Sequence, residues 1–488
     1  MSSAAVVIAI FAAAQPSNGF TLSSPRARLR ELKIDDISAP PDQGVVLEDT
    51  YSDYHQPIHK IIRDLDGNPL STEYFATAMG IKHVESYSCP EEDAFRGFMS
   101  NACRVKLFPG GESAFYKRIV FKDLGHAWEK LKTAPFKLIR DLQSYKVVAS
   151  FLKSKACHVM VKKTGVKIPK CYDAKLEPNE TDPIESKFSF LLEDLSPEDG
   201  WYQKWLLDEK DECEACLTTY AKIHAFFWHG SSFWDDKDAA KEFESAVWKS
   251  GSYVQPHAQN PDQWKTVAKE WAIKKMKFAK TKLSSFDYWD NLGERLEAVA
   301  EECGRQSHPF AEDESFSSEY HQWRTFTHGD PKQANIFFRR SDETSEIQQV
   351  ALIDYQWSGF GLAASDIAHF LTSAVYADLL EDSGEEYLMR FYYDELQKYL
   401  VEYGAFASVD DARRGYSYEL FTGQYETAVL DLCRLIIAYT WDRFDQPAEK
   451  GDEAACALTM NKTSYNKSIP TAIWLMSKCD EILKARGV

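Results

Sequence analysis

One short stretch of the sequence holds residue types that can transfer a proton and bind a metal ion. Residues 326–338 read FTHGDPKQANIFF and contain His328, Asp330 and Asn335, and a second carboxylate, Asp354, follows further along the chain. One carboxylate and one amide oxygen can hold a hard cation such as Mg²⁺ and leave positions for phosphate oxygens and water. The remaining carboxylate can accept a proton from an attacking hydroxyl. This set is the minimum equipment for phosphoryl transfer, where catalysis is mostly positioning and charge neutralisation.

Two β-rich runs are expected to position these side chains. The runs NIFF and QVALID are separated by the polar turn SDETSEI, which predicts a β-hairpin within residues 326–356. Hairpin pairing brings the start of the first strand near the end of the second. Asp330, Asn335 and Asp354 are therefore expected to converge.

The rest of the chain predicts an α+β protein with a small strand-rich lobe and a larger, mostly helical lobe that carries the hairpin. The predicted divisions are residues 1–30 (presequence or tail), 31–70 (N-terminal extension), 71–195 (strand-rich lobe) and 196–488 (helical lobe).

Within the strand-rich lobe the patterns predict a helix capped by Ser71 or Thr72 and five strands, with a hairpin turn at 109–113 and one long helix after the third strand. Two further helices are predicted from QPIHKIIRDL, before this lobe, and from PDQWKTVAKEWAIKKMKFAKTKL, in the helical lobe.

The motif HGDPKQAN followed by LIDYQ resembles the paired signature of the aminoglycoside phosphotransferase and choline kinase superfamily. LLEDL and AKIHAFFW are similar to the ecdysteroid-kinase-like branch. The resemblance implies a protein-kinase-like bilobal fold and an ATP- and Mg²⁺-dependent small-molecule kinase. It implies that Asp330 is the catalytic base, that Asn335 and Asp354 are metal ligands, and that His328 orders the loop. Asp366, which opens the helix after the hairpin, is expected to brace this loop.

The same resemblance implies a nucleotide site in the strand-rich lobe. Lys117, in the third predicted strand, matches the lysine that holds the α- and β-phosphates. The stretch RGFMSNACRV stands where the family has its phosphate-covering turn, with Gly97, Ser100 and Asn101 as candidates, although it lacks a glycine-rich repeat. The hinge that meets adenine is expected at three consecutive residues, Leu192, Glu193 and Asp194.

One position departs from the family pattern. Val148, in SYKVVASFL, stands where the glutamate partner of the lysine belongs, and Asp141 lies about two helical turns earlier. This departure is consistent with a weakened ATP site, with another acidic partner, or with a nucleotide-binding pseudokinase that acts as a scaffold.

Other classes of function fit the sequence less well. A formal net charge of −18 argues against nucleic acid, which needs a basic surface. GFGLAA (359–364) fits a dinucleotide fingerprint, but no strand–helix–strand unit continues beyond it. Cys213 and Cys216 lack the second pair that a zinc site needs, and we interpret Cys216 as a packed helix residue. HGD in place of H-R-D and the short connection from Asp354 to Asp366 favour a small-molecule alcohol over a protein substrate.

Aromatic residues of the helical lobe suggest either a pocket or a core. Trp228, Trp234 and Trp441 are candidates for the walls of a ligand pocket, but aromatic residues at helical spacing usually form core, which is the interpretation we favour.

The N-terminus has the pattern of a targeting segment. The apolar run at 4–14 is too short to span a bilayer but has the length of a signal-peptide core. An acid-free, basic stretch follows, as in the two-part presequences of complex plastids, with Phe20 as the candidate first residue after cleavage. The alternatives are a secretory signal or a tail of a cytoplasmic protein. No later stretch predicts a membrane span.

Overall fold

The computed structural model describes residues 61–89, 94–96, 101–204, 206–255, 264–439, 441 and 469–488. The predicted presequence and most of the predicted N-terminal extension lie outside these residues. The chain forms two compact units. We call them the β-rich unit, which comprises the described residues from 61 to 138 together with 172–197, and the helical unit, which comprises the described residues of 139–171 and of 198–488.

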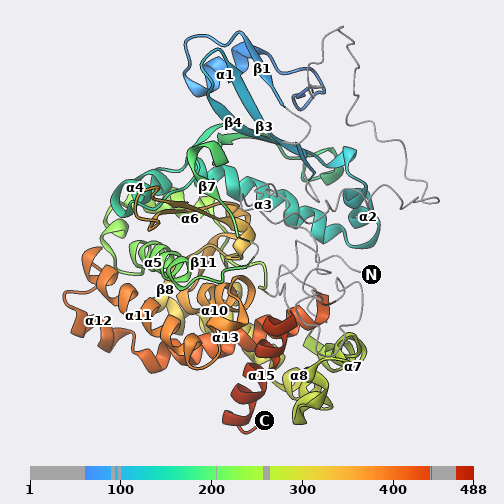
Figure 1. Ribbon diagram of the computed structural model, residues 1–488, viewed down its shortest axis with the longest axis vertical. Helices are drawn as coiled ribbons and strands as arrows, with labels where there is room; N and C mark the ends of the chain where they lie inside the picture. Colours follow the sequence, from blue (N-terminus) through green and yellow to red (C-terminus); the bar gives the residue numbers. More distant parts are fainter. Residues whose placement is uncertain are drawn as a thin grey trace. The chain divides into compact units, whose positions relative to one another are not determined.

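The β-rich unit is built on an antiparallel sheet with the strand order β1-β3-β4-β6-β5, and β2 also pairs with β3 (Figure 1). It contains one strand more than the sequence predicted, because Ala94–Arg96 also pairs. Its elements are α1 (Thr72–Met79), β1 (Ser86–Ser88), β2 (Ala94–Arg96), β3 (Asn101–Phe108), β4 (Ser113–Val120), α2 (Gly125–Thr133), β5 (Cys171–Glu177) and β6 (Lys187–Glu193).

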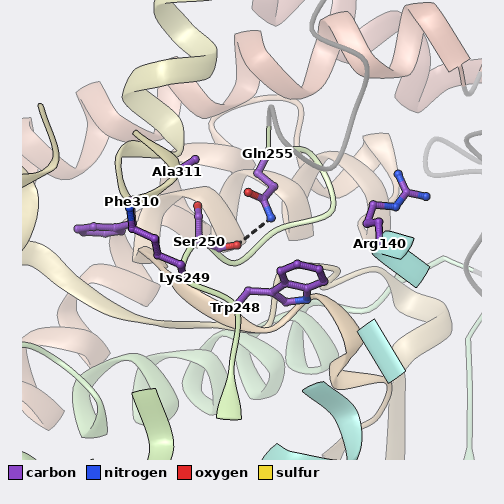
Figure 2. A pocket seen from close by; sticks show the side chains of 7 residues that line it. All are labelled: Arg140, Trp248, Lys249, Ser250, Gln255, Phe310 and Ala311. Atoms are coloured by element: carbon purple, nitrogen blue, oxygen red, sulfur yellow. Dashed lines mark hydrogen bonds between the residues drawn. The ribbon is translucent and has the colours of Figure 1, made fainter. Parts of the chain in front are cut away.

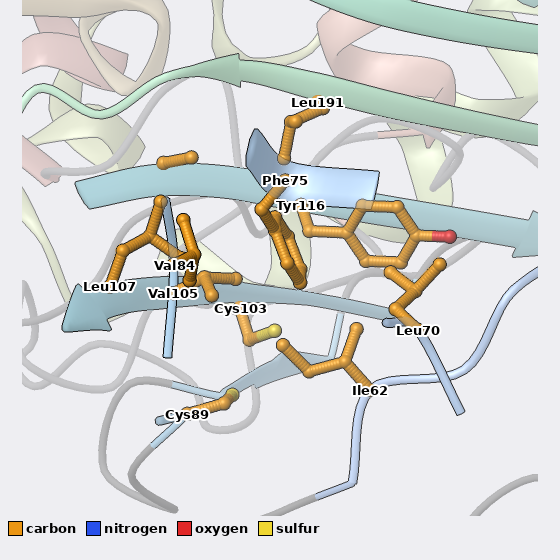
Figure 3. Close-up of a cluster of buried hydrophobic side chains, with 11 residues drawn as sticks. Ile62, Leu70, Phe75, Val84, Cys89, Cys103, Val105, Leu107, Tyr116 and Leu191 are labelled. Atoms are coloured by element: carbon orange, nitrogen blue, oxygen red, sulfur yellow. The ribbon is translucent and has the colours of Figure 1, made fainter. Parts of the chain in front are cut away.

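The core of this unit lies between α1 and one face of the sheet. Phe75, the buried residue of α1, packs with Val105, Tyr116 and Leu191 from three neighbouring strands (Figure 3). The predicted cap is confirmed, since the Ser71 hydroxyl accepts a hydrogen bond from the amide of Tyr74 at 3.1 Å. Apolar burial on alternate strand positions therefore fixes which face of the sheet α1 covers.

One predicted helix of the extension is wrong in its described part. Residues 61–65 of QPIHKIIRDL are not helical; Arg63 instead forms a β-bridge with Pro69. The amides of Asp66 and Asn68 donate to the Asp64 carboxylate at 2.9 Å each. This local side-chain bonding favours a turn over the helix that the apolar spacing indicated.

The helical unit contains most of α3 and nearly all of the helices that follow (Figure 1). Its helices are α3 (Pro135–Lys153), α4 (Lys155–Thr164), α5 (Lys210–Phe226), α6 (Lys237–Ala246), α7 (Val267–Lys274), α8 (Leu292–Ser307), α9 (Glu314–Ser317), α10 (Ala363–Ala374), α11 (Gly384–Glu402), α12 (Val409–Gly415), α13 (Tyr418–Tyr439) and α15 (Ile469–Ala485). None of the helices among the described residues is long and apolar enough to cross a bilayer.

The long helix predicted from residues 261–283 is broken. α7 ends at Lys274, and two short 3₁₀ helices, Lys275–Phe278 and Lys282–Ser285, follow it. The hydroxyl of Thr281 accepts from the amide of Leu283 and donates to the carbonyl of Phe278. These bonds satisfy the backbone locally between the two 3₁₀ helices.

Two small sheets in the helical unit hold the predicted hairpin and its flanks. β9 (Ile336–Arg340) pairs with β10 (Ile347–Leu352) and with β7 (Trp201–Tyr202), and β8 (Arg324–Thr327) pairs with β11 (Gly359–Leu362). The GFGL stretch of the dinucleotide-like motif is thus strand β11 and leads directly into α10.

An aromatic cluster supports the β8–β11 sheet from one side. Phe326 of β8 and Phe360 of β11 lie 5.3 and 5.7 Å, centroid to centroid, from the ring of Phe243, which stacks on Phe227 at 4.4 Å. Such packing holds β8 and β11, which flank the loop at 328–335 and the hairpin, in fixed positions.

Candidate active site

The hairpin brings the predicted metal ligands to neighbouring positions. Ile336 pairs with Leu352 at the end of the ladder, and the amide of Ile353 donates to the carbonyl of Asn335 at 3.0 Å. Asp354 follows at once and adopts a left-handed conformation, with φ 66° and ψ 60°. Non-glycine residues adopt this conformation rarely, often at functional sites. The hairpin thus bonds Asn335 to the residue before Asp354, and the metal-binding roles of Asn335 and Asp354 stay predictions.

The catalytic loop before β9 is held by a single buried carboxylate. Asp366, on α10, accepts from the backbone amides of His328 at 2.6 Å and Gly329 at 3.0 Å, and His224 Nε2 lies 3.3 Å from it. Burial raises the pKa of this carboxyl, but the hydrogen bond and charge of His224, with those of the loop, outweigh burial and lower the pKa. Asp366 is thus an ionised brace of the loop, as predicted.

The loop has a backbone that only glycine can complete. Gly329 has φ 80°, and a Cβ there would collide with the carbonyl oxygen of Trp357. The ring of His328 bridges the loop and the hairpin, because Nε2 lies 2.9 Å from the carbonyl of Ile353 and Nδ1 accepts from the amide of Asp330 at 3.3 Å. These partners place the proton on Nε2. The ordering role predicted for His328 agrees with these contacts.

Asp330 lies at the centre of the loop and is fully buried. One carboxylate oxygen, Oδ2, lies 3.1 Å from the Lys332 ammonium and 3.3 Å from Asn335 Nδ2. The other, Oδ1, has no hydrogen-bond partner among the described residues, and His369 Nε2 is 3.8 Å from it. Two donors therefore fix the carboxylate and leave one oxygen available.

The Asn335 side chain likewise has one polar atom with a hydrogen-bond partner and one without. Its Nδ2 donates to the carbonyl of Asp330 at 2.8 Å, while its Oδ1 is buried without a partner among the described residues. A buried acceptor oxygen without a donor is rare in proteins and costly, unless a ligand satisfies it. An amide oxygen and a carboxylate oxygen, such as those of Asn335 and Asp354, are ligand types that suit Mg²⁺.

Two residues of the site were not found from the sequence. Lys332 lies within HGDPKQAN, and its side chain is only 2% exposed beside Asp330. His369 lies on α10, three residues after Asp366, and is buried. Burial lowers the pKa of His369 to about 4, in spite of the attraction of Asp330. The i, i+3 spacing to Asp366 was the signal for His369, since it places both side chains on one helix face.

α3 contributes Tyr145 to the surroundings of Asp354. Burial raises the pKa of the Tyr145 hydroxyl well above its ordinary value, and the charges of Asp141 and Asp354 raise it further. Both carboxylates therefore lie near this ring. Asp141 is fully buried and accepts from Arg140 Nη2 at 3.1 Å. Val148, one of the apolar residues of the same helix, is 9% exposed.

The predicted nucleotide residues that are described lie on neighbouring strands of the β-rich unit. Lys117 of β4 is opposite Phe190 of β6, and its side chain is buried, whereas a lone strand lysine usually faces solvent. Leu192, Glu193 and Asp194 end β6 or follow it, and the Asp194 carboxylate accepts from Arg104 Nε at 2.7 Å. Gly97 and Ser100 lie outside the described residues. The nucleotide-binding roles of all these residues stay predictions.

The aromatic candidates belong mainly to the core. Trp228 packs against Tyr416 with a centroid separation of 5.0 Å, Trp441 packs against Phe278 at 4.3 Å, and both tryptophans are fully buried. Cys216 is also buried on α5, as interpreted from the sequence.

One acidic cluster elsewhere is an ion-pair network. Asp208, Glu209 and Glu212 lie close enough to share a cation. Lys204 contacts all three, and Arg340 contacts Glu209 and Glu212. Basic side chains therefore neutralise this cluster.

An antiparallel sheet with a buried lysine and a helical unit with a braced HGD loop and hairpin are the features of a protein-kinase-like fold. The sequence profile of the ecdysteroid kinase-like family matches residues 138–404, more than half of the chain. The chain belongs to this family, and the resemblance stated from its motifs is confirmed.

Solved structures with similar folds include three kinases. The Plasmodium vivax ethanolamine kinase is 12% identical, with 75% of this chain and 82% of that chain covered and a TM-score of 0.33. Amicoumacin kinase in complex with AMP-PNP, Ca²⁺ and Ami is 11% identical, with 85% and 92% covered and a TM-score of 0.37. An aminoglycoside phosphotransferase from Alicyclobacillus acidocaldarius is 14% identical, with 80% and 90% covered and a TM-score of 0.31. No curated protein sequence matches the chain significantly.

Proposed function

We propose that this protein is an ATP- and Mg²⁺-dependent phosphotransferase that phosphorylates a hydroxyl group of a small molecule. The observation that carries the proposal is the pair of buried acceptor atoms, Asp330 Oδ1 and Asn335 Oδ1, that have no hydrogen-bond donor among the described residues. One is suited to the proton of an acceptor alcohol, the other to a cation. Family membership supports the same reaction class.

Asp330 would act as the general base. Lys332 and Asn335 hold Oδ2, so Oδ1, which has no hydrogen-bond donor among the described residues, is the oxygen that would accept the proton of a hydroxyl. As the hydroxyl proton passes to Oδ1, the alcohol oxygen forms a bond to the γ-phosphorus. The bond from that phosphorus to the bridging oxygen breaks, and ADP leaves with the electron pair.

Asn335 and Asp354 would hold Mg²⁺, which, when bound, neutralises phosphate charge. The bond from the amide of Ile353 to the carbonyl of Asn335 supports this assignment, because Asp354 is the residue after Ile353. Lys117 would contact the α- and β-phosphates, and the backbone of residues 192–194 would meet adenine. His328 and Asp366 would keep the loop in place without contacting the substrate.

A second candidate function is a nucleotide-binding scaffold without turnover. The observation that favours it is Val148, a largely buried apolar residue at the position where the family pattern has a glutamate. A kinase in which the lysine has no glutamate partner would retain the fold but transfer the phosphoryl group more slowly.

Thermal unfolding of the full chain, with and without Mg·ATP, tests the nucleotide site. A ligand at a hundred times its dissociation constant stabilises the native state by about 2.7 kcal/mol, which moves a midpoint by a few degrees. A Mg²⁺-dependent shift followed by ADP release with an alcohol from a screening panel supports the phosphotransferase. A shift without turnover for any alcohol favours the scaffold, and no shift at millimolar nucleotide overturns both.

A further inference from the structure

An exposed stripe of lysine and apolar residues follows α7 and the 3₁₀ helix after it. Between residues 264 and 283 the exposed residues are Lys265, Lys269, Ala272, Ile273, Met276, Lys280 and Lys282. We call the first six of these residues the lysine ridge. Apart from one adjacent pair, they follow one another at intervals of three or four residues, so they share one face of the helix, and none of them is acidic.

The lysine ridge lies opposite the face that attaches α7 to the protein. Val267 and Trp271 are buried at four-residue spacing on α7, and Phe278 continues their row. Trp271 and Phe278 pack against Trp441 with centroid separations of 5.8 and 4.3 Å. In Figure 1, α7 lies beside α8 at the edge of the helical unit. The lysine ridge therefore faces away from the core of this unit.

The apolar centre of the ridge is highly exposed. Among the large apolar residues in the described part of the chain, Ile273 and Met276 have the highest exposed fractions, 59% and 56%. Single exposed apolar residues need no explanation, but two on one helix face form a small patch. Withdrawing the exposed part of one such side chain from water strengthens a complex about fivefold to twentyfold.

The ridge also carries positive charge. Lys274 pairs with Glu270 at 3.0 Å, but it is buried and does not belong to the ridge. Lys265 and Lys269, which do belong to it, have no ion pair among the described residues. The whole chain has a formal net charge of −18, so a cationic stripe is not a consequence of the composition. Its chemistry calls for an anionic partner.

Three kinds of partner fit the ridge poorly. A second copy of the chain would place lysine against lysine across a two-fold interface, where like charges repel. Protein interfaces are depleted in lysine and enriched in aromatic residues, and the ridge has no aromatic residue. A small molecule needs a concave site, and the cavity of about 180 Å³ shown in Figure 2 is lined by Trp248, Phe310 and other residues outside the ridge.

Lysines beside exposed aliphatic side chains suit the headgroup region of an anionic bilayer. The ammonium groups reach the lipid phosphates and carboxylates, while aliphatic side chains lie deeper, at the acyl boundary. Each lysine near such a surface strengthens binding about fivefold. Acidic residues more than about 8 Å from the surface are screened at physiological salt. The net negative charge of the chain is therefore compatible with this contact.

We propose that the lysine ridge docks the protein on the surface of a membrane that contains anionic lipids. Ile273 and Met276 enter the interface, and Lys265 and Lys269 contact the headgroups. The inference is independent of the proposed phosphotransferase function, because the ridge shares no residue with the candidate active site.

Flotation of the full chain with lipid vesicles tests the inference. The vesicles are phosphatidylcholine alone and phosphatidylcholine with roughly 30% phosphatidylserine, at about 0.15 M and about 1 M salt. We expect binding to the anionic vesicles to be at least about tenfold tighter than to the neutral vesicles at the lower salt, and this preference to be lost at the higher salt. Equal binding to both vesicles at the lower salt, or binding to neither, overturns the inference.

Two double variants locate the contact. Lys265→Gln/Lys269→Gln should weaken binding to the anionic vesicles about tenfold to thirtyfold, and Ile273→Gln/Met276→Gln should weaken it at least about tenfold. Because these side chains are exposed, the melting temperature should stay at the wild-type value. If either double variant binds the anionic vesicles as tightly as the wild type, the ridge is not the docking surface and the inference is overturned.

Matched controls remove the same residue types elsewhere. Lys162→Gln/Lys163→Gln removes two exposed lysines of α4, and Ile139→Gln removes an isoleucine of α3 that is 50% exposed. Neither control should change binding to the anionic vesicles. If the controls weaken binding as much as the ridge variants do, total charge or general apolarity sets the affinity and the inference is overturned. The apolar run at 4–14 is present in every variant, so binding that persists in both ridge variants also counts against the ridge.

Discussion

Replacing Asp366 with asparagine perturbs the catalytic loop through a buried side chain that braces it. In the native protein the two carboxylate oxygens accept separately from the amides of His328 and Gly329. Asparagine keeps one acceptor and turns an NH₂ group toward the other amide. One buried N–H is left unpaired, which costs about 1–3 kcal/mol, and the remaining hydrogen bond is weaker because its acceptor is no longer charged. The closed state of the loop is therefore destabilised by about 2–4 kcal/mol relative to the open state.

Amide hydrogen exchange, measured by mass spectrometry in peptides that cover residues 326–338, detects this opening directly. A change of about 2–4 kcal/mol corresponds to a loss of roughly 30- to 1000-fold in the protection of the His328 and Gly329 amides. Exchange is preferable to a single unfolding midpoint because a chain with two compact units need not unfold in one step.

Asp410→Asn is the matched control. Asp410 lies in the first turn of α12 and is exposed, so the substitution removes only a favourable interaction with the helix dipole, about 0.3–1 kcal/mol. Exchange in 326–338 should be unaltered by it. If Asp366→Asn leaves protection of the loop within about threefold of the wild type, the brace contributes little and the reasoning is refuted.

Three further predictions concern the site itself. Asp330→Asn should abolish turnover and leave the Mg·ATP thermal shift intact; full activity would remove the base assignment. Asp354→Ala should weaken Mg·ATP binding itself, measured by titration, and unchanged affinity would count against a metal role. The pKa of His369 is about 4 in the folded protein and 6.5 ordinarily, so a stability contribution of about 3 kcal/mol is present above pH 6.5 and is lost as pH falls toward 4. In His369→Gln, the free energy of unfolding, measured by urea denaturation, should therefore fall less steeply between pH 6.5 and 4. An unchanged pH dependence would refute this prediction.

Local patterns of the sequence determined the elements and the chemistry of the loop. The sequence correctly predicted the Ser71 cap and the hairpin strands that contain NIFF and QVALID. Each of these features depends on residues that are close together in the chain. The pairing of Asn335 with the residues before Asp354 followed from hairpin geometry alone. The helix predicted across 261–283 was wrong in extent, since α7 covers only Val267–Lys274 and two 3₁₀ helices follow it.

Only the tertiary structure decided which polar groups are satisfied and which are open. The amides of His328 and Gly329 find their acceptor 38 and 37 residues away at Asp366, and His224 reaches the same carboxylate from 142 residues away. The same holds for the aromatic residues, since Trp228 and Trp441 fill the core while Trp248 lines a cavity. Periodicity reports that a side chain faces inward, but burial of a donor or acceptor is decided by elements distant in sequence.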